Sequence, residues 1–314
     1  MRKGLLEGSS PITQLIMLCF CMITCFLMLM FIGILFAPLI LGIPATELIN
    51  GVNNGTMEQN LNLMRYLQTL QGFGLFIIPA FFAAYLFSGM PVGYFGLERA
   101  TSAKWFGATL LLMLAIIPCI NLLTALNEMI VFPKSLSGLE QRLKDFEDAA
   151  QQATKLFLNV DNAGGMFFNI FMIALLPALG EELIFRGLLQ KIFIKWTGNI
   201  HVAIFITGFL FSFIHLQFYG FFPRWLLGVM LGYLLVWSGT IWLPIFAHFV
   251  NNASAIIFSY MIQKGVIPEG VEEFGASFGE IPVTIITTAI ATWLLWKFYQ
   301  HFNTISRKNP LFLQ

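Results

Sequence analysis

Ionisable and amide side chains interrupt three long apolar stretches in the second half of the chain. Such groups are costly to bury in hydrocarbon unless they are paired or hydrated, so they are the first candidates for function. In chain order they are Glu181, Glu182, Arg186, His215, His248, Asn251 and Asn252. Any one of them alone could be a packing residue, but their joint occurrence on three stretches favours a shared site.

The first stretch contains two adjacent carboxylates that face different ways on a helix. Glu182 and Arg186 are four residues apart, so they share a face and are predicted to form an ion pair that orients the site. Glu181 is rotated by about 100° from Glu182 and has no local partner of opposite charge. Glu181 is therefore the candidate for acid–base chemistry.

The other two stretches repeat the four-residue spacing. Phe211 and His215 share one helix face, and His248 and Asn252 share another. A carboxylate in an apolar pocket suits a general base, and a nearby imidazole can help it to hold and deprotonate a water. Imidazole and amide donors can stabilise the oxyanion of peptide hydrolysis. The set therefore indicates a hydrolase, with Asn251 as a supporting donor.

A metal site uses some of the same residues. Glu181, His215 and His248 could supply three ligands to a zinc ion and leave a fourth position open for water. The sequence has neither a His-Glu-x-x-His helix nor a Gly-x-Ser-x-Gly turn, so the common zinc-protease and serine-hydrolase routes lack their motifs. No cofactor is favoured, and zinc remains possible.

Membrane-spanning helices are expected to carry these groups, because 58% of the 314 residues are hydrophobic and only 11% are charged. A net charge of +1 offers no field for nucleic acid. A span needs about 20 apolar residues, and the turn cluster at 238–240 splits one long stretch in two. An all-α, polytopic protein with about eight transmembrane helices is predicted, over residues 12–37, 67–90, 105–132, 164–195, 199–219, 222–238, 241–263 and 281–302.

The chain divides into three parts around the polar groups. Residues 1–160 form N-terminal transmembrane helices plus an amphipathic extracytoplasmic helix, residues 161–265 form the catalytic core, and residues 266–314 form a loop and the last helix. The amphipathic helix follows apolar positions from Leu136 to Phe157, and Ser137 with Glu140 predicts a capping box at its start. This helix either rests on the bilayer or caps a substrate entrance.

Charge placement gives an orientation. With both termini inside, the inner face carries nine Lys/Arg and two acids, whereas the outer loops carry seven Lys/Arg and twelve acids. The N- and C-termini are therefore predicted to be cytoplasmic. Short inner loops are compatible with a prokaryotic inner (plasma) membrane.

The sequence also predicts two details of how the helices pack. Gly228 and Gly232 make a small-xxx-small spacing that predicts a close helix contact. Straight helices would place His215 nearer the outer side than Glu181, so we expect either helices that are kinked or shortened at Pro177, Gly187 or Pro223, or a later start of the fifth span.

Taken together, Glu181-Glu182-x-x-x-Arg186, Phe211-x-x-x-His215 and His248-x-x-x-Asn252 resemble the three ordered motifs of the CPBP family, the CAAX protease and bacteriocin-processing enzymes, also called the Abi or type II CAAX protease family. The resemblance covers about residues 164–260.

This resemblance implies an intramembrane endopeptidase that hydrolyses a peptide bond of a membrane-associated protein or peptide, with bacteriocin-type leader peptides among the substrates. Glu181 and His215 would activate water, while His248 and Asn252 would bind the oxyanion. The remaining motif positions, Glu182, Arg186 and Phe211, would orient the site. A metal-independent glutamate protease is favoured over a zinc enzyme.

A non-enzymatic class would display similar groups. Buried Glu, His and Arg side chains on facing helices also occur in proton-coupled transporters, and a bacteriocin-immunity protein could keep the motifs while acting only by binding. The sequence shows no inverted repeat of the transporter kind. Substitution of Glu181 separates the classes, because it should abolish proteolysis while pure binding could survive.

Overall fold

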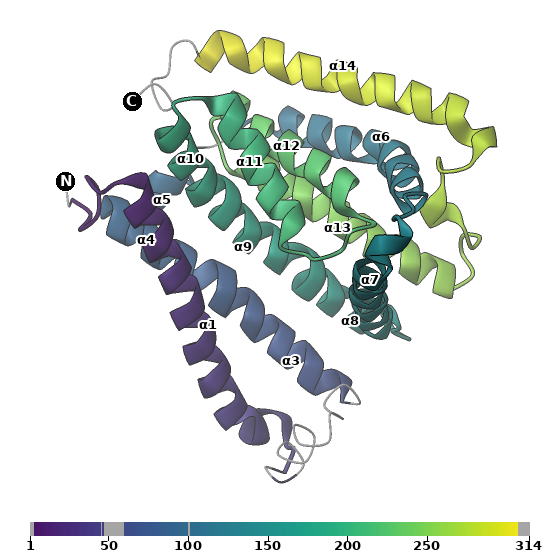
Figure 1. Ribbon diagram of the computed structural model, residues 1–314, viewed down its shortest axis with the longest axis horizontal. Helices are drawn as coiled ribbons and strands as arrows, with labels where there is room; N and C mark the ends of the chain where they lie inside the picture. Colours follow the sequence, from purple (N-terminus) through teal and green to yellow (C-terminus); the bar gives the residue numbers. More distant parts are fainter. Residues whose placement is uncertain (1–2, 45, 47–59, 100, 307–314) are drawn as a thin grey trace.

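The computed structural model describes residues 3–44, 46, 60–99 and 101–306. Within these residues the chain is helical without a strand (Figure 1). Seven helices of the described chain are long and apolar enough to cross a membrane: Pro11–Leu41, Leu61–Ser88, Ala103–Glu128, Ala163–Thr197, Phe221–Ser238, Trp242–Gln263 and Phe278–Phe302. The predicted all-α, polytopic membrane class is confirmed, and each of the seven overlaps one predicted span.

The eighth predicted span is shorter than expected. Helix α11 covers Ile200–Phe213, only 14 residues, and begins where the Asn199 side chain accepts hydrogen bonds from the next turn. The predicted span 199–219 therefore starts correctly and ends six residues too late. His215 lies beyond the helix, in a turn over residues 214–220 that leads to α12, Phe221–Ser238.

The N-terminal helices form a layer beside the core. Helix α1, Pro11–Leu41, packs against α3, Leu61–Gly72, and α4, Ile78–Ser88, which are joined by the π-helical η2, Phe73–Ile77. In Figure 1 α3 lies between α1 and the rest of the bundle, with which it stays in contact. The short α5, Pro91–Phe95, then leads to α6, Ala103–Glu128, which pairs with α14, Ile281–Ser306, on the far side of the core.

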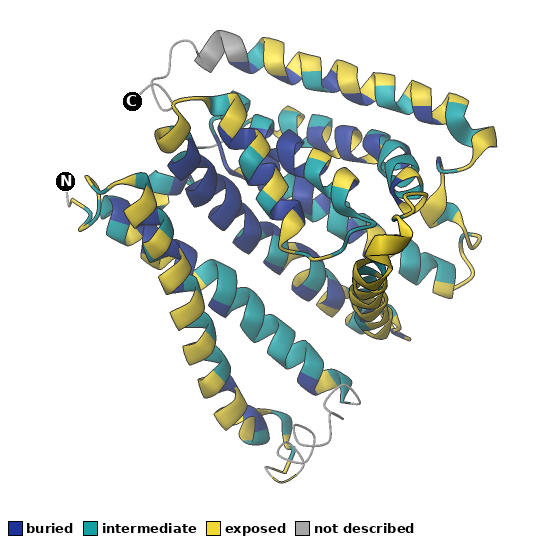
Figure 2. Cartoon of the chain, viewed as in Figure 1, coloured by how far each residue is buried: buried dark blue, intermediate teal, exposed yellow. Residues whose placement is uncertain are grey.

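The core is built around one long helix interrupted twice by π-helical turns. Its parts are α8 (Ala163–Asn169), η4 (Ile170–Leu175), α9 (Leu176–Ile184), η5 (Phe185–Leu189) and α10 (Gln190–Thr197). It packs against α11, α12 and α13, Trp242–Gln263. In Figure 2 this region is the most deeply buried part of the chain, whereas α1 and α14 expose much of their surface, as lipid-facing helices do.

Helices α11 and α12 approach closely at the predicted glycines. A Cβ on Gly228 would lie 2.9 Å from the Gly208 Cα, and one on Gly232 would lie 2.9 Å from the Ile204 side chain. Contacts this short leave no room for a side chain. The close helix contact predicted from the glycine spacing is confirmed.

The amphipathic helix is present as α7, Ser137–Leu158, but its predicted capping box is not. A short 3-10 turn, η3, Lys134–Leu136, runs directly into α7, so Ser137 already has helical geometry and cannot act as the cap. Glu140 instead pairs with Lys144 at 2.9 Å. Phe157 is buried, whereas Phe146 on the same predicted apolar face is exposed.

Hydrogen bonds between distant segments define two ends of the bundle. At the terminal end, Lys195 Nζ donates to the carbonyl of Ser9, 2.7 Å away, just before α1. At the α7 end, Lys264 Nζ donates to the carbonyl of Asp161, 2.8 Å away, just before α8. Figure 1 shows α7 opposite the start of α1, and α14 ending near the terminal end. A lysine therefore bonds a backbone carbonyl at each end of the helix bundle.

Candidate active site

An ion pair in the middle of the long helix anchors the site. Arg186 Nη1 lies 2.8 Å from Glu182 Oε1, and both side chains are fully buried. The pair predicted from the four-residue spacing is therefore confirmed. Arg186 Nη2 donates to the carbonyl of Gly228 at 2.8 Å, and its guanidinium lies 4.6 Å from the centre of the Phe211 ring. Arg186 thus links the long helix to α11 and α12.

His248 on α13 completes a hydrogen-bonded group around Glu182. Its Nδ1 donates to Glu182 Oε1 at 2.9 Å, since an ionised carboxylate only accepts. The opposite ring atom, Nε2, is directed to Glu181, 3.9 Å from Oε2. Glu182 therefore fixes which ring nitrogen of His248 faces the neighbouring carboxylate, as carboxylates do for histidines in many sites.

Glu181 is the carboxylate of the site that faces His248 without a hydrogen bond to it. Its side chain is largely buried, and Oε2 has no hydrogen-bond partner among the described residues. His248, Glu182, Arg186 and Arg224 all act on it electrostatically. An acceptor held in this way is available to a water or a substrate, because nothing in the described chain already occupies it.

His215 reaches the site from the turn after α11. Its Nδ1 donates to the carbonyl of Phe211 at 2.8 Å, which leaves Nε2 as the free acceptor in the neutral ring. The Phe211 ring lies 5.4 Å from the His215 ring and 5.6 Å from the His248 ring. The Phe211 ring therefore contacts both histidine rings and the Arg186 guanidinium.

The expected depth mismatch of His215 is explained by a shortened helix, which was one of the predicted alternatives, although the helix ends at Phe213 and not at one of the three predicted positions. The fifth helix does not begin later, because α11 starts at Ile200. Instead, α11 ends at Phe213, and His215 lies in the turn that follows. The long helix changes its winding at two π segments, Ile170–Leu175 and Phe185–Leu189, which flank the glutamates. Of the three predicted kink positions only Gly187 lies inside one of them. Such turns are frequent at functional sites.

Asn252 lies one turn after His248, with its amide already engaged. Asn252 Nδ2 donates to the carbonyl of Ile173 at 3.3 Å, inside the π segment η4. Its Oδ1 accepts from Asn251 Nδ2 at 3.1 Å, so the supporting contact expected of Asn251 is present. The amide nitrogen carries two N–H groups, so Asn252 can keep this bond and donate its second N–H to an oxyanion.

Two polar residues of this region were not singled out from the sequence. Arg224, near the start of α12, acts electrostatically on both Glu181 and His215, and its Nη2 donates to Gln217 Oε1 at 2.9 Å. An arginine within the predicted span 222–238 was the available signal. Gln217 carried no such signal, because its importance depends on contacts between distant segments.

A cavity of about 300 Å³ adjoins the site at the α7 end. It lies between α6, α7, the 214–220 turn, α12 and α13, and its walls include Glu147, Tyr219, Arg224 and Asn251. Because Asn251 bonds Asn252 and Arg224 acts on Glu181, the cavity borders the groups described above. It offers a polar approach to the site from one side of the membrane.

The possible zinc ligands are not gathered as a metal site. Among the described residues, no group of three or more His, Cys, Asp or Glu side chains is arranged to hold a metal ion. One ring nitrogen of His248 bonds Glu182 and one of His215 bonds the backbone, so each histidine has one remaining nitrogen.

Comparison with known proteins covers the same part of the chain. Residues 163–254 match the family model described as type II CAAX prenyl endopeptidase Rce1-like. The uncharacterized protein YpbD of Bacillus subtilis (strain 168) is 29% identical over 92 residues, which make up 27% of this chain and 42% of that protein. The sporulation-killing factor biosynthesis protein SkfC of the same organism is 31% identical over 97 residues, 28% of this chain and 19% of that protein.

The chain thus spans less than half the length of either relative. No solved structure matches it. The family match includes all three motifs, from Glu181 to Asn252, and α8 to α13 are the elements that carry them. The family resemblance predicted from the three motifs is confirmed over residues 163–254, the part of the chain that matches the Rce1-like, type II CAAX prenyl endopeptidase model.

Proposed function

We propose that this protein is an intramembrane endopeptidase that hydrolyses a peptide bond of a membrane-associated protein or peptide without a metal. The observation that carries the proposal is the buried Glu181 carboxylate, which has an oxygen free of hydrogen bonds in the described chain and faces His248 Nε2. A general base must keep an open acceptor for the proton that it removes. The neighbouring carboxylate, Glu182, also has an oxygen without a partner among the described residues, but its side chain is fully buried and its other oxygen accepts from both Arg186 and His248, whereas the Glu181 side chain is 12% exposed.

In this mechanism Glu181 takes a proton from a water whose oxygen attacks the peptide carbonyl carbon. The free Nε2 of His215 accepts a hydrogen bond from the same water and orients it. The new C–O bond places negative charge on the carbonyl oxygen. When the C–N bond breaks, Glu181 returns the proton to the leaving amine, so protons and charge balance over the cycle.

The oxyanion is bound by His248 and Asn252. The Glu182 carboxylate stabilises the positively charged imidazolium of His248, in which Nε2 also carries a proton and can donate to the oxyanion. The Asn252 amide supplies the second donor through the N–H that does not bond the Ile173 carbonyl. Arg186 and Phe211 hold this arrangement together from α11 and α12.

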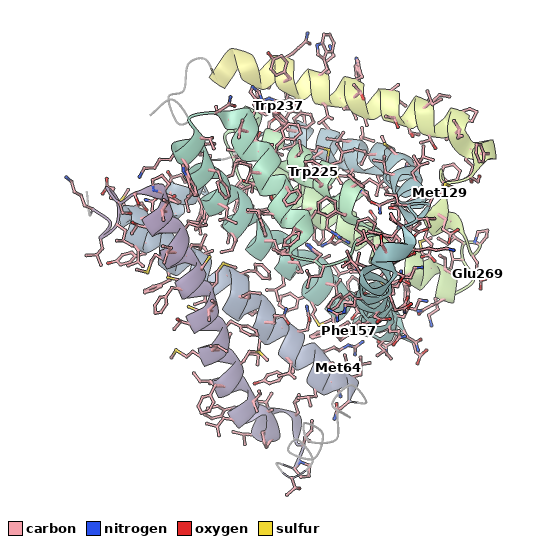
Figure 3. The ribbon with its side chains drawn as sticks, in the orientation of Figure 1. Met64, Met129, Phe157, Trp225, Trp237 and Glu269 are labelled. Atoms are coloured by element: carbon pink, nitrogen blue, oxygen red, sulfur yellow. The ribbon has the colours of Figure 1, made fainter. Side chains whose placement is uncertain are left out.

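The experiment compares Glu181→Gln with wild type in cleavage of a mixed peptide library by detergent-purified, chelator-treated protein. Loss of the base should lower the rate by about 10²- to 10⁴-fold. Glu269→Gln is the matched control, because Glu269 is exposed and lies at the edge of the molecule (Figure 3). Retained hydrolysis in Glu181→Gln contradicts the mechanism, and activity restored only by added zinc makes Glu181, His215 and His248 ligands instead.

The variant should keep its fold. Glu181 Oε2 has no hydrogen-bond partner among the described residues, so exchanging the carboxylate for an amide removes no bond from that atom. We expect an unchanged far-ultraviolet circular dichroism spectrum and a melting temperature equal to or above that of wild type. Binding of a peptide without cleavage by the wild type would favour an immunity or transport protein.

The relatives and the membrane helices support a proposed substrate class and setting. One relative is named for the biosynthesis of a sporulation-killing factor, which favours a peptide or membrane-protein substrate in a bacterial membrane. The apolar spans make the bilayer the second partner. We place the protein in a prokaryotic plasma membrane with both termini cytoplasmic, so that the cavity opens on the outer side.

A further inference from the structure

The turn that carries His215 has an unfavourable backbone conformation. Leu216 has φ of 55°, and it is the one non-glycine residue with positive φ in the described part of the chain. Left-handed geometry brings Cβ of an L-residue too close to the following carbonyl, so other contacts must hold it. Strain of this kind next to a proposed catalytic residue indicates that the position of that residue is enforced.

Gln217, the next residue, makes contacts that can enforce it. Its Nε2 donates to Glu147 Oε1 on α7 at 3.3 Å, and its Oε1 accepts from Arg224 Nη2 on α12 at 2.9 Å. The Gln217 amide therefore joins three segments that are far apart in sequence. On the other side of the turn, Asn127 Nδ2 of α6 donates to the Phe218 carbonyl at 2.9 Å.

The two partners of Gln217 depend on it. Glu147 Oε2 and Arg224 Nη1 are buried, and neither has a hydrogen-bond partner among the described residues. The two side chains carry opposite charges and lie in the wall of the same cavity, yet the structure shows Gln217 between them rather than a direct ion pair. Loss of the Gln217 amide would leave a buried acceptor and a buried donor on two elements without their bonds.

We infer that Gln217 is a positioning residue of the proposed peptidase site: by joining Glu147 of α7 to Arg224 of α12 it holds the strained turn and thereby fixes His215. This inference rests on the proposed function. It also couples α7 to the site, because a displacement of Glu147 releases one side of the turn. In Figure 1 α7 lies across the end of the bundle where this turn emerges.

The first test replaces Gln217 by leucine, which has a similar volume and no hydrogen-bonding groups. With the peptide that wild type cleaves, we expect kcat to fall about tenfold or more while KM stays within about threefold, because the variant misplaces a reacting group without removing substrate contacts. Gln151→Leu is the control, since Gln151 lines the same cavity from α7. An unchanged kcat in Gln217→Leu, or a change confined to KM, overturns the inference.

A kinetic cycle tests the connection to α7. Glu147→Leu should lower kcat like Gln217→Leu, and the double variant should lose little more, because both changes break one linked group of bonds. Glu147→Gln keeps an acceptor oxygen for Gln217 and should retain most of the activity. Multiplicative losses in the double variant would show that the two residues act independently and would contradict the coupling.

Hydrogen exchange supplies a readout that does not depend on catalysis. Peptides covering residues 211–220 should exchange faster in Gln217→Leu and Glu147→Leu than in wild type, and at the wild-type rate in Gln151→Leu. If wild type cleaves nothing, the proposed function fails, and this measurement still decides whether the turn is held as inferred. Unchanged exchange in Gln217→Leu overturns the inference, whatever the activity.

Discussion

One oxygen of Glu182 accepts hydrogen bonds from both Arg186 and His248, and this sharing controls the chemistry of the site. The carboxylate neutralises a fully buried guanidinium and also sets the orientation of a histidine 66 residues away in sequence. Glu181 makes neither of these bonds, and our proposal assigns the proton transfer to it. The two adjacent glutamates therefore differ in their partners and in their burial.

We predict that Arg186→Met destabilises the protein by about 3–5 kcal/mol, since it leaves the buried Glu182 carboxylate without its cationic partner. Unfolding in mixed micelles with increasing SDS, followed by circular dichroism, measures the loss. Arg142→Met on the exposed face of α7 is the control and should change stability little. A loss below about 1 kcal/mol in Arg186→Met would show that the pair is not needed for the fold.

At the scale of single residues, the sequence predicted contacts within a helix better than contacts between helices. The Glu182–Arg186 pair follows from a four-residue spacing, which helix geometry alone determines. The bond between Glu182 and His248 joins distant helices, and the bridge from Gln217 to Glu147 and Arg224 depends on how a turn and α7 are placed. No local pattern contains that information. The catalytic roles of Glu181, His215, His248 and Asn252 remain predictions.

At the scale of helices, the close contact between α11 and α12 positions the ion pair. Gly228 provides the carbonyl that accepts from Arg186, and it does so where its own Cα faces Gly208 without a side chain between them. The two helices can therefore approach, and the carbonyl lies within reach of the long helix. Gly228 therefore contributes both to the packing of α11 against α12 and to the position of the Arg186 side chain.

Gly228→Ala should therefore weaken both stability and activity. The added Cβ would lie 2.9 Å from the Gly208 Cα and 3.2 Å from its carbonyl oxygen, which are backbone atoms that cannot rotate away. We expect a destabilisation of about 1–3 kcal/mol, with lower peptide cleavage, measured by SDS unfolding and the peptide assay. Gly107→Ala, where a Cβ meets no other atom within 4 Å, should be neutral or slightly stabilising.

The ends of helices were harder to predict than their existence. Hydropathy identified every long span, because lipid-facing surface must be apolar along the whole helix. It could not show that α11 stops at Phe213, since apolar residues continue past the end of the helix. The π-helical turns were not predicted either, because they change the winding of a helix without changing its composition. The capping box at Ser137 was wrong because the preceding 3-10 turn already occupies the cap position.

At the scale of the whole molecule, the charges separate between the two ends. Lys191 and Lys195 lie in the last turns of the long helix, and Arg99 bonds the Gly239 carbonyl near them, which places these cations at the terminal end. The acidic α7 region lies at the other end (Figure 1). Positive charge is retained in the cytoplasm, so the terminal end is the side that we place there.

A reporter fused after Gln314 tests this orientation. Green fluorescent protein at the C-terminus should fluoresce, whereas alkaline phosphatase at the same position should be inactive, because it folds only outside the cytoplasm. Fusions truncated within the loop between α13 and α14, at Glu269, should give the opposite pair of results. The reverse pattern would place the cavity on the cytoplasmic side and would contradict the proposed topology.

The short α11 also has a consequence for the lipids around the protein. Fourteen residues of α-helix extend about 21 Å, whereas the hydrocarbon layer of a typical bilayer is about 30 Å thick. Neighbouring helices in the core are longer, so the mismatch is confined to one side of the molecule. A helix shorter than the hydrocarbon layer favours thinning of the bilayer beside it. We therefore expect a thinner membrane next to the proposed catalytic residues, where the peptide bonds of a membrane-embedded substrate would lie closer to water.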